Sequence, residues 1–111
     1  MELVEIRRDP LVIVEPRGRI DTVAAEPFGN RLTELIRSGS RHMLIDLQHV
    51  IYISSAGFRA LLIAGKLAEE SNAKLVLCGL SAEIKRLFEI GTFMDLFTIC
   101  ASREDGMVKA Q

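Results

Sequence analysis

Short apolar runs and amphipathic segments alternate along the chain, and each kind predicts a different element. Two β-prone runs, at 3–6 and 11–14, flank Asp9-Pro10, a pair that suits the turn of a hairpin. The stretch 18–22 is expected to break the second strand. Apolar residues at helical spacing then predict a helix over 24–38, in which a proline at position 27 is tolerated only in the first turn.

The rest of the chain alternates strand-like and helix-like periods joined by short connections. Such alternation predicts parallel strands linked by helical crossovers, and with the hairpin it gives an α/β domain: a mixed β-sheet covered by helices. The predicted elements are a strand at 43–47, a loop of some extended character at 50–53, a helix from 58 to about 72, a strand at 75–78, a helix between Ser81 and Gly91, a short strand at 93–100 and a polar tail of helical character at 102–111.

Composition narrows the class of protein. A length of 111 residues predicts one domain over 1–111, and a net charge of −1 argues against direct nucleic-acid binding. The apolar runs are too short for membrane insertion, and Met1–Glu5 carries acids where a signal peptide is basic. Cys78 and Cys100 are too few for a structural disulfide framework or a zinc site. We therefore expect a cytoplasmic protein.

The candidate site is the segment 48–56, which should lie beyond the carboxyl end of a parallel strand, where ligands and partners usually bind. It is apolar for a loop except for Ser54 and Ser55, which stand where the next helix begins. A hydroxyl there caps free backbone N–H groups, and the same position favours a phosphate. Spacing alone does not separate the two roles.

The stretch DLQHVIYISSAGFRALL at 46–62 resembles the signature of bacterial anti-sigma factor antagonists of the STAS-domain family. Gly18-Arg19-Ile20-Asp21 resembles the element before that family's first helix. The segments 75–81 and 84–88 resemble its fourth strand and third helix. The similarity extends over roughly 3–99 and implies a single STAS domain.

This resemblance implies a switch by partner exchange. An unphosphorylated antagonist binds an anti-sigma factor that is also a serine kinase and so frees the sigma factor. The kinase phosphorylates the antagonist and ends the association, and a metal-dependent serine phosphatase restores it. Aligning on Gly57-Phe58 places the acceptor at Ser55, with Ser54 where the family often carries Asp. The resemblance therefore implies a protein that is not an enzyme and needs no cofactor.

The implied partner-binding residues surround the acceptor: Asp21, Ser54, Ser55, Ala56, Gly57 and Arg59. Asp21 is equally consistent with a helix cap. Phe58 and Leu62 are expected in the core, which leaves Arg59 as the surface candidate. Two rival functions stay open, a STAS subunit of another signalling or lipid-transport assembly and a sensor of a small molecule or nucleotide.

Other chemistries fit the residues poorly. A nucleophile elbow needs glycine where Ile53 stands, and no phosphate-binding Gly-rich loop is present. His42 and His49 lack neighbouring carboxylates or cysteines, so a surface or strand-end role is expected rather than metal binding. Asp46 is expected either to bind loop amides or to orient Ser55. Cys78 is expected to be a small core residue.

Overall fold

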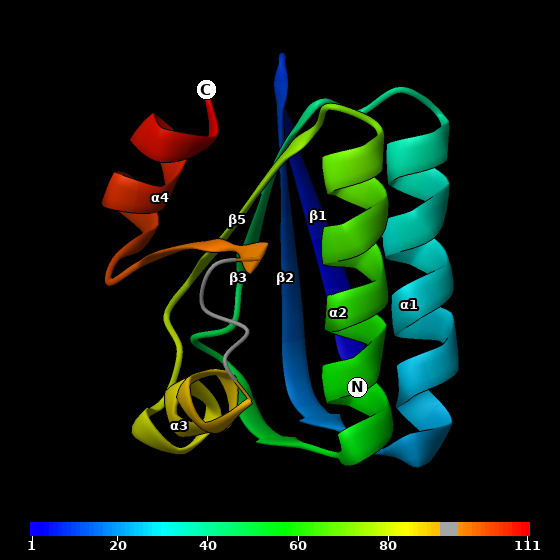
Figure 1. Cartoon of the computed structure of the whole chain (residues 1–111), viewed down its shortest axis with the longest axis vertical. Coiled ribbons are helices and arrows are strands. Elements are labelled where there is room, and N and C mark those ends of the chain that lie inside the picture. Colours follow the sequence, from blue (N-terminus) through cyan, green and yellow to red (C-terminus); the bar gives the residue numbers. More distant parts are fainter. Residues whose placement is uncertain (92–95) are drawn as a thin grey trace.

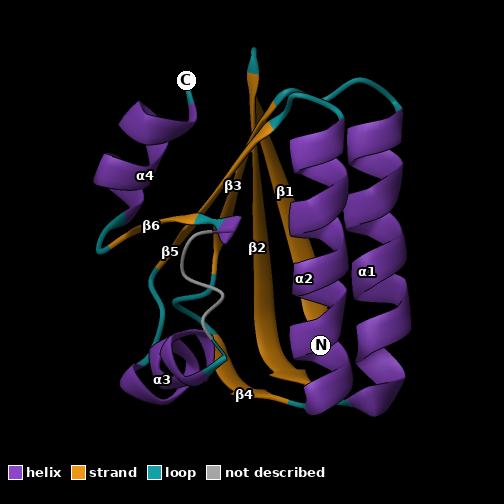
Figure 2. Cartoon of the chain, in the orientation of Figure 1, coloured by secondary structure: helices purple, strands orange, loops and turns teal. Residues whose placement is uncertain are grey.

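The computed structural model describes residues 1–91 and 96–111, and a mixed β-sheet runs through it between two unequal helical layers (Figures 1 and 2). The sheet order is β1-β2-β3-β5-β6, and β4 pairs with β2. Of the strands in the described residues, β1 alone is antiparallel to its neighbour. The predicted α/β fold is thus confirmed. The strands are β1 (Glu2–Arg8), β2 (Leu11–Ile20), β3 (His42–Asp46), β4 (Val50–Ile53), β5 (Lys74–Cys78) and β6 (Thr98–Cys100), and the helices are α1 (Thr22–Arg37), α2 (Ser55–Glu70), α3 (Ala82–Ile90) and α4 (Arg103–Ala110).

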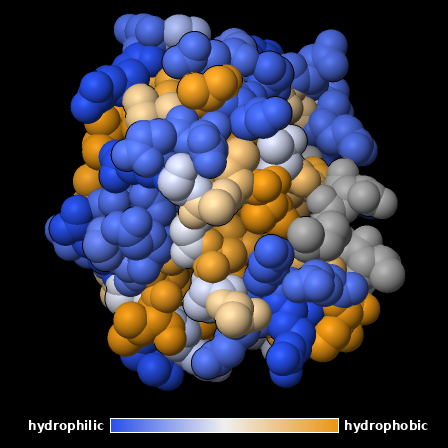
Figure 3. All heavy atoms as spheres, turned by 90° about the vertical axis from the view of Figure 1, so that its left-hand side faces the viewer, coloured by the Kyte–Doolittle hydropathy of each residue, from blue (hydrophilic) through white to orange (hydrophobic). Residues whose placement is uncertain are grey.

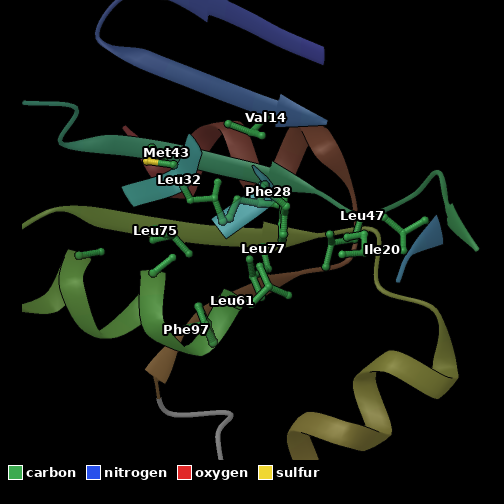
Figure 4. Packing of buried hydrophobic residues seen from close by; sticks show 14 of the residues in the cluster. Val14, Ile20, Phe28, Leu32, Met43, Leu47, Leu61, Leu75, Leu77 and Phe97 are labelled. Atoms are coloured by element: carbon green, nitrogen blue, oxygen red, sulfur yellow. The ribbon is translucent and has the colours of Figure 1, made fainter. Parts of the chain in front are cut away.

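The middle of the sheet is built from uninterrupted apolar runs, at 11–14, 43–45 and 75–78, because both of its faces are covered there. Along β2, Val12 and Val14 face the larger core beneath α1 and α2, whereas Leu11 and Ile13 face α4. Strands β3 and β5 alternate in the same way. Figure 4 shows the larger core, in which side chains from the strands meet those of the two long helices. The predicted burial of Cys78 is confirmed, since it is fully buried on the α4 side.

The second strand ends within the stretch 18–22, as the sequence predicts, but two residues into it rather than at its start. Strand β2 continues to Ile20, with a register shift between Gly18 and Arg19. Gly18 adopts a φ of 98°, which a residue with a side chain rarely tolerates. Beyond this irregularity β2 pairs with Val50–Ile53, which forms a strand rather than the expected loop.

Helix α1 begins two residues earlier than predicted. Asp21 is its N-cap, and the carboxylate accepts a hydrogen bond from the Ala24 backbone N–H at 2.8 Å. Pro27 consequently lies in the second turn, not the first. Its missing N–H removes one bond within the helix, and the ring is on the exposed side. Helix packing against the core, through Phe28 and Leu32 among others, overrides that local cost.

The last predicted strand is shorter than expected. Residues 93–95 of the predicted span 93–100 lie outside the described part of the chain, and β6 begins only at Thr98. The preceding Phe97 is buried beside Gly65 of α2 and makes an edge-to-face contact with Phe88, with ring centroids 5.4 Å apart. Insertion of this ring into the core takes position 97 out of the strand.

The polar tail forms helix α4, as its sequence character suggested, and α4 lies on the face of the sheet opposite α1 and α2 (Figure 1). Polar contacts fix both of its ends. Arg103 donates to Glu15 at 3.0 Å, His42 Nδ1 lies 2.7 Å from the Ala110 carbonyl oxygen, and Lys74 donates to the Gln111 carbonyl oxygen at 2.6 Å. These contacts supplement the small apolar area that α4 buries.

Apolar side chains reach the surface between charged ones on the face that carries α3, β6 and α4 (Figure 3). Helix α3 has exposed apolar side chains at Leu87 and Ile90, and α4 has one at Val108. Within the described residues, none of the helices has the length and hydropathy that a bilayer span requires.

Candidate functional site

The two candidate serines occupy different positions at the start of α2. Ser54 is the N-cap: its side chain is buried, and its hydroxyl oxygen accepts a hydrogen bond from the Gly57 N–H at 3.1 Å. Ser55 is the first residue of the helix and is exposed. The capping role therefore belongs to Ser54, and the hydroxyl accessible to another protein belongs to Ser55.

Close backbone packing fixes the start of α2 against the sheet. The Ser54 N–H donates to the Ile20 carbonyl oxygen at 2.8 Å, and a Cβ at Gly57 would lie 2.7 Å from Ile20 Cγ2 and 2.9 Å from Ile53 Cγ1. Any side chain at position 57 would push the helix away from β2 and β4. Gly57 is thus a packing requirement, and it holds the helix N-terminus in place.

Both long helices begin at this edge of the sheet (Figure 2). Ile20, which receives the bond from Ser54, is followed directly by Asp21, the exposed N-cap of α1. The cap interpretation of Asp21 is therefore confirmed. Two helix N-termini, each with partially positive N–H groups, lie at the same edge, and this is the electrostatic setting that favours an added anion.

Exposed apolar side chains occur directly before the serines. Ile51 is 76% exposed and Tyr52 43% exposed, although both belong to β4. The Arg19 guanidinium lies over the Tyr52 ring, 4.3 Å from its centroid, a cation–π contact that holds the ring. Val23, in the first turn of α1, is 84% exposed. In the sequence, the one sign of this exposed apolar surface is that the segment 48–56 is apolar for a loop.

A groove of about 350 Å³ runs between α1 and α2. Small residues create it: Gly29 and Ala60 touch where the helices pack, and Ala56 adds to its floor. Glu26 and Arg59 supply charges of opposite sign along it. Because Ala56 follows Ser55 directly, the groove continues the surface that carries the exposed serine.

Arg59 is exposed, as predicted. Phe58 and Leu62, which were expected in the core, are half-buried and pack against the edge of the larger core. The Phe58 ring contacts Phe88 of α3 edge to face, with centroids 4.9 Å apart. Ser55 and Arg59 are four residues apart on one helix, a spacing that places their side chains on the same face.

Asp46 belongs to a second polar cluster, on the α4 side of the sheet. Its Oδ1 accepts from the Gln48 N–H at 3.0 Å, which supports the loop-amide alternative over an orienting role for Ser55. Arg103 Nη1 lies 3.6 Å from Asp46 Oδ2 and 3.0 Å from Glu15 Oε1. Sequence reasoning missed Glu15 and Arg103, because nothing local relates residues this far apart in the chain.

Glu15 is almost fully buried, yet its pKa lies below the ordinary value. Burial alone would raise that pKa. The hydrogen bond from Arg17 and the positive charges of Arg17 and Arg103 outweigh burial and keep the carboxylate ionised. The cluster has a structural role at the N-terminus of α4. Within the described residues, no group of His, Cys, Asp or Glu has an arrangement that could hold a metal ion.

Comparison with known proteins agrees with the fold and identifies the family. The profile of the STAS domain matches residues 2–106. BtrV of Bordetella bronchiseptica, which is named as an anti-sigma factor antagonist, is 33% identical over 104 residues, 94% of this chain and 90% of the relative. The chain therefore belongs to the STAS domain family, and the resemblance to anti-sigma factor antagonists is confirmed.

Solved structures agree in fold. A Thermotoga maritima protein described as an anti-sigma factor antagonist superposes with a TM-score of 0.90 at 16% identity, over 97% of this chain and 93% of that one. The phosphorylated form of the Bacillus cell fate determinant SpoIIAA superposes with a TM-score of 0.81 at 14% identity, over 99% of this chain and 100% of that one. At such identities the similarity concerns the fold alone.

Proposed function

We propose that this protein is an anti-sigma factor antagonist whose association with an anti-sigma factor serine kinase is ended by phosphorylation of Ser55. One observation carries the proposal: Ser55 is the exposed first residue of α2, whereas Ser54 is buried and caps the helix. A kinase needs an accessible hydroxyl, so of the two serines Ser55 is the acceptor. The protein is the substrate of that kinase and of a metal-dependent phosphatase, and is not itself an enzyme.

The fold is suited to carry the phosphate without rearranging. A phosphoserine adds roughly −1.5 to −2 charges and three acceptor oxygens. At Ser55 these oxygens would lie at the N-terminus of α2, whose dipole favours negative charge, with Arg59 one turn along the same face. SpoIIAA, a protein of the same fold, exists in a phosphorylated form.

The surface around Ser55 explains why the charge would end the association. Ile51, Tyr52 and Val23 present exposed apolar area at the same edge as Ser55. A partner covering this area excludes water, and a phosphate would then be desolvated beneath it. A penalty of about 3 kcal/mol weakens binding by roughly two orders of magnitude.

Phosphorylation of the purified protein by a candidate anti-sigma factor kinase with Mg-ATP tests the proposal. We expect one phosphate per chain, mapped to Ser55 by mass spectrometry. The variant Ser55→Ala should accept none, and Ser54→Ala should still be phosphorylated. Phosphate on Ser54 in the wild type, or unchanged labelling of Ser55→Ala, would contradict the assignment.

A further inference from the structure

Cys78 and Cys100 are register partners in the adjacent parallel strands β5 and β6. Both pack in the smaller apolar cluster on the α4 side of the sheet, so their side chains leave the two strands on the same face. Cys78 is fully buried and Cys100 is half-buried. They are the only two cysteines of the chain.

We infer that these two residues form a modification site, a reversible disulfide bond between Cys78 and Cys100 that a peroxide generates. Neighbouring strands lie about 4.8 Å apart, within the Cα separations of roughly 4.4 to 6.8 Å that disulfides span. The inference does not depend on Ser55 or on any partner of the protein.

The position of β6 allows the small movement that the bond needs. The two Cβ atoms of a disulfide lie about 3.8 Å apart. This is closer than the spacing of about 4.8 Å between neighbouring strands of a regular sheet. β6 is a three-residue strand at the end of the sheet order, and β5 is its neighbour in the pairing. Moving β6 toward β5 disturbs few contacts but leaves some strain in the bond. Strained disulfides are more readily reduced than unstrained ones. The bond is therefore suited to a reversible response rather than to permanent stabilisation.

The chemistry assigns different roles to the two thiols. Burial, together with the nearby Asp46 carboxylate, raises the pKa of the Cys78 thiol to about 12, which makes it a poor first nucleophile. The more accessible Cys100 attacks the peroxide, giving a sulfenic acid and one water. The Cys78 thiol then displaces the sulfenic hydroxyl, forming the sulfur–sulfur bond and a second water. Two thiols and one hydrogen peroxide thus give one disulfide and two waters.

Treatment of the native protein with hydrogen peroxide tests this inference. We expect a loss of about 2 Da in the intact mass, from the two thiol hydrogens, and full recovery of the original mass with dithiothreitol. Tryptic digestion without reductant should yield the peptide 75–85 joined to the peptide 87–103, because these contain Cys78 and Cys100 respectively.

Matched variants separate the two roles. In Cys78→Ser, the sulfenic acid on Cys100 should accumulate and be trapped by dimedone. In Cys100→Ser, the buried thiol should stay unmodified over the same time. The inference would be overturned by over-oxidation of Cys100 in the wild type without a link between the two peptides. Covalent dimers in place of an internal bond would overturn it too, as would equally fast linkage in the urea-unfolded chain.

Discussion

The backbone N–H of Ser54 donates to the carbonyl oxygen of Ile20 at 2.8 Å, and this bond joins the start of α2 to the end of β2. Ile20 also precedes Asp21, the N-cap of α1. This bond, together with the close packing of Gly57 against Ile20, keeps the N-termini of both helices at one edge of the sheet. Ser55 is the residue that this arrangement leaves exposed.

Replacing either serine with alanine should separate capping from signalling. Ser54→Ala removes the oxygen that accepts from the Gly57 N–H, and we expect a loss of about 1 kcal/mol in the free energy of unfolding. Ser55→Ala is the matched control and should change that free energy by less than about 0.5 kcal/mol, because the side chain is exposed. Urea titration followed by circular dichroism measures both. A larger loss for Ser55→Ala would show that Ser55 has a structural role.

Gly57→Ala tests whether close packing positions the helix. The added Cβ would lie 2.7 Å from Ile20 Cγ2 and 3.0 Å from the Ile20 carbonyl oxygen, so the first turn of α2 must shift. We expect a destabilisation of about 1–3 kcal/mol, typical of overpacking, although alanine is the better helix former. Thermal unfolding measures it. Unchanged or increased stability would mean that the turn adapts freely.

Much of the architecture could be predicted because local patterns determine it. Uninterrupted apolar runs marked the central strands, and the caps Ser81 and Gly91 bounded α3. The errors lie where tertiary packing decides. The irregularity at Gly18 sends β2 onward to pair with β4, and the burial of Phe97 shortens β6. No local signal in the sequence reports either event.

The candidate site was predictable in part for the same reason. The residues around the serines are contiguous, so their place at the start of α2 followed from the sequence. Which of the two caps the helix depends on the backbone entering from β4, and only the structure shows this. The hydrogen bond from Arg103 to Glu15 joins residues far apart in the chain, so no local pattern in the sequence predicts it.

Glu15 should make stability depend on pH. Its pKa in the folded protein is below the ordinary 4.5, so its contribution is present above pH 4.5 and is lost as pH falls through the folded-state pKa. At pH 7, Glu15→Gln should cost about 1–2 kcal/mol, a modest value because Arg17 is half exposed. The difference in the free energy of unfolding between Glu15→Gln and the wild type should become smaller as the pH falls below 4.5.

Urea titrations of both proteins between pH 3 and pH 7 measure this dependence. Glu26→Gln is the matched control, since Glu26 is exposed and should give nearly the same stability as the wild type throughout. A difference between wild type and Glu15→Gln that stays constant over the whole range would contradict the ionic role of Glu15.

A fixed charge at position 55 should weaken the partner without unfolding the domain. Ser55→Asp places a carboxylate at the N-terminus of α2, where the helix dipole tolerates it, so the melting temperature should stay near that of the wild type. Affinity for the anti-sigma factor kinase should fall, though less than with a phosphate, because a carboxylate carries a single negative charge and lacks the third acceptor oxygen. Ser55→Ala is the control. An affinity of Ser55→Asp equal to that of Ser55→Ala would contradict this expectation.

The most direct measurement is calorimetric titration of that kinase, without ATP, with the protein before and after stoichiometric phosphorylation of Ser55. We expect the phosphorylated protein to bind at least about 100-fold more weakly, while its circular dichroism spectrum and melting temperature remain those of the unmodified domain. Equal affinity of the two forms would contradict the proposal.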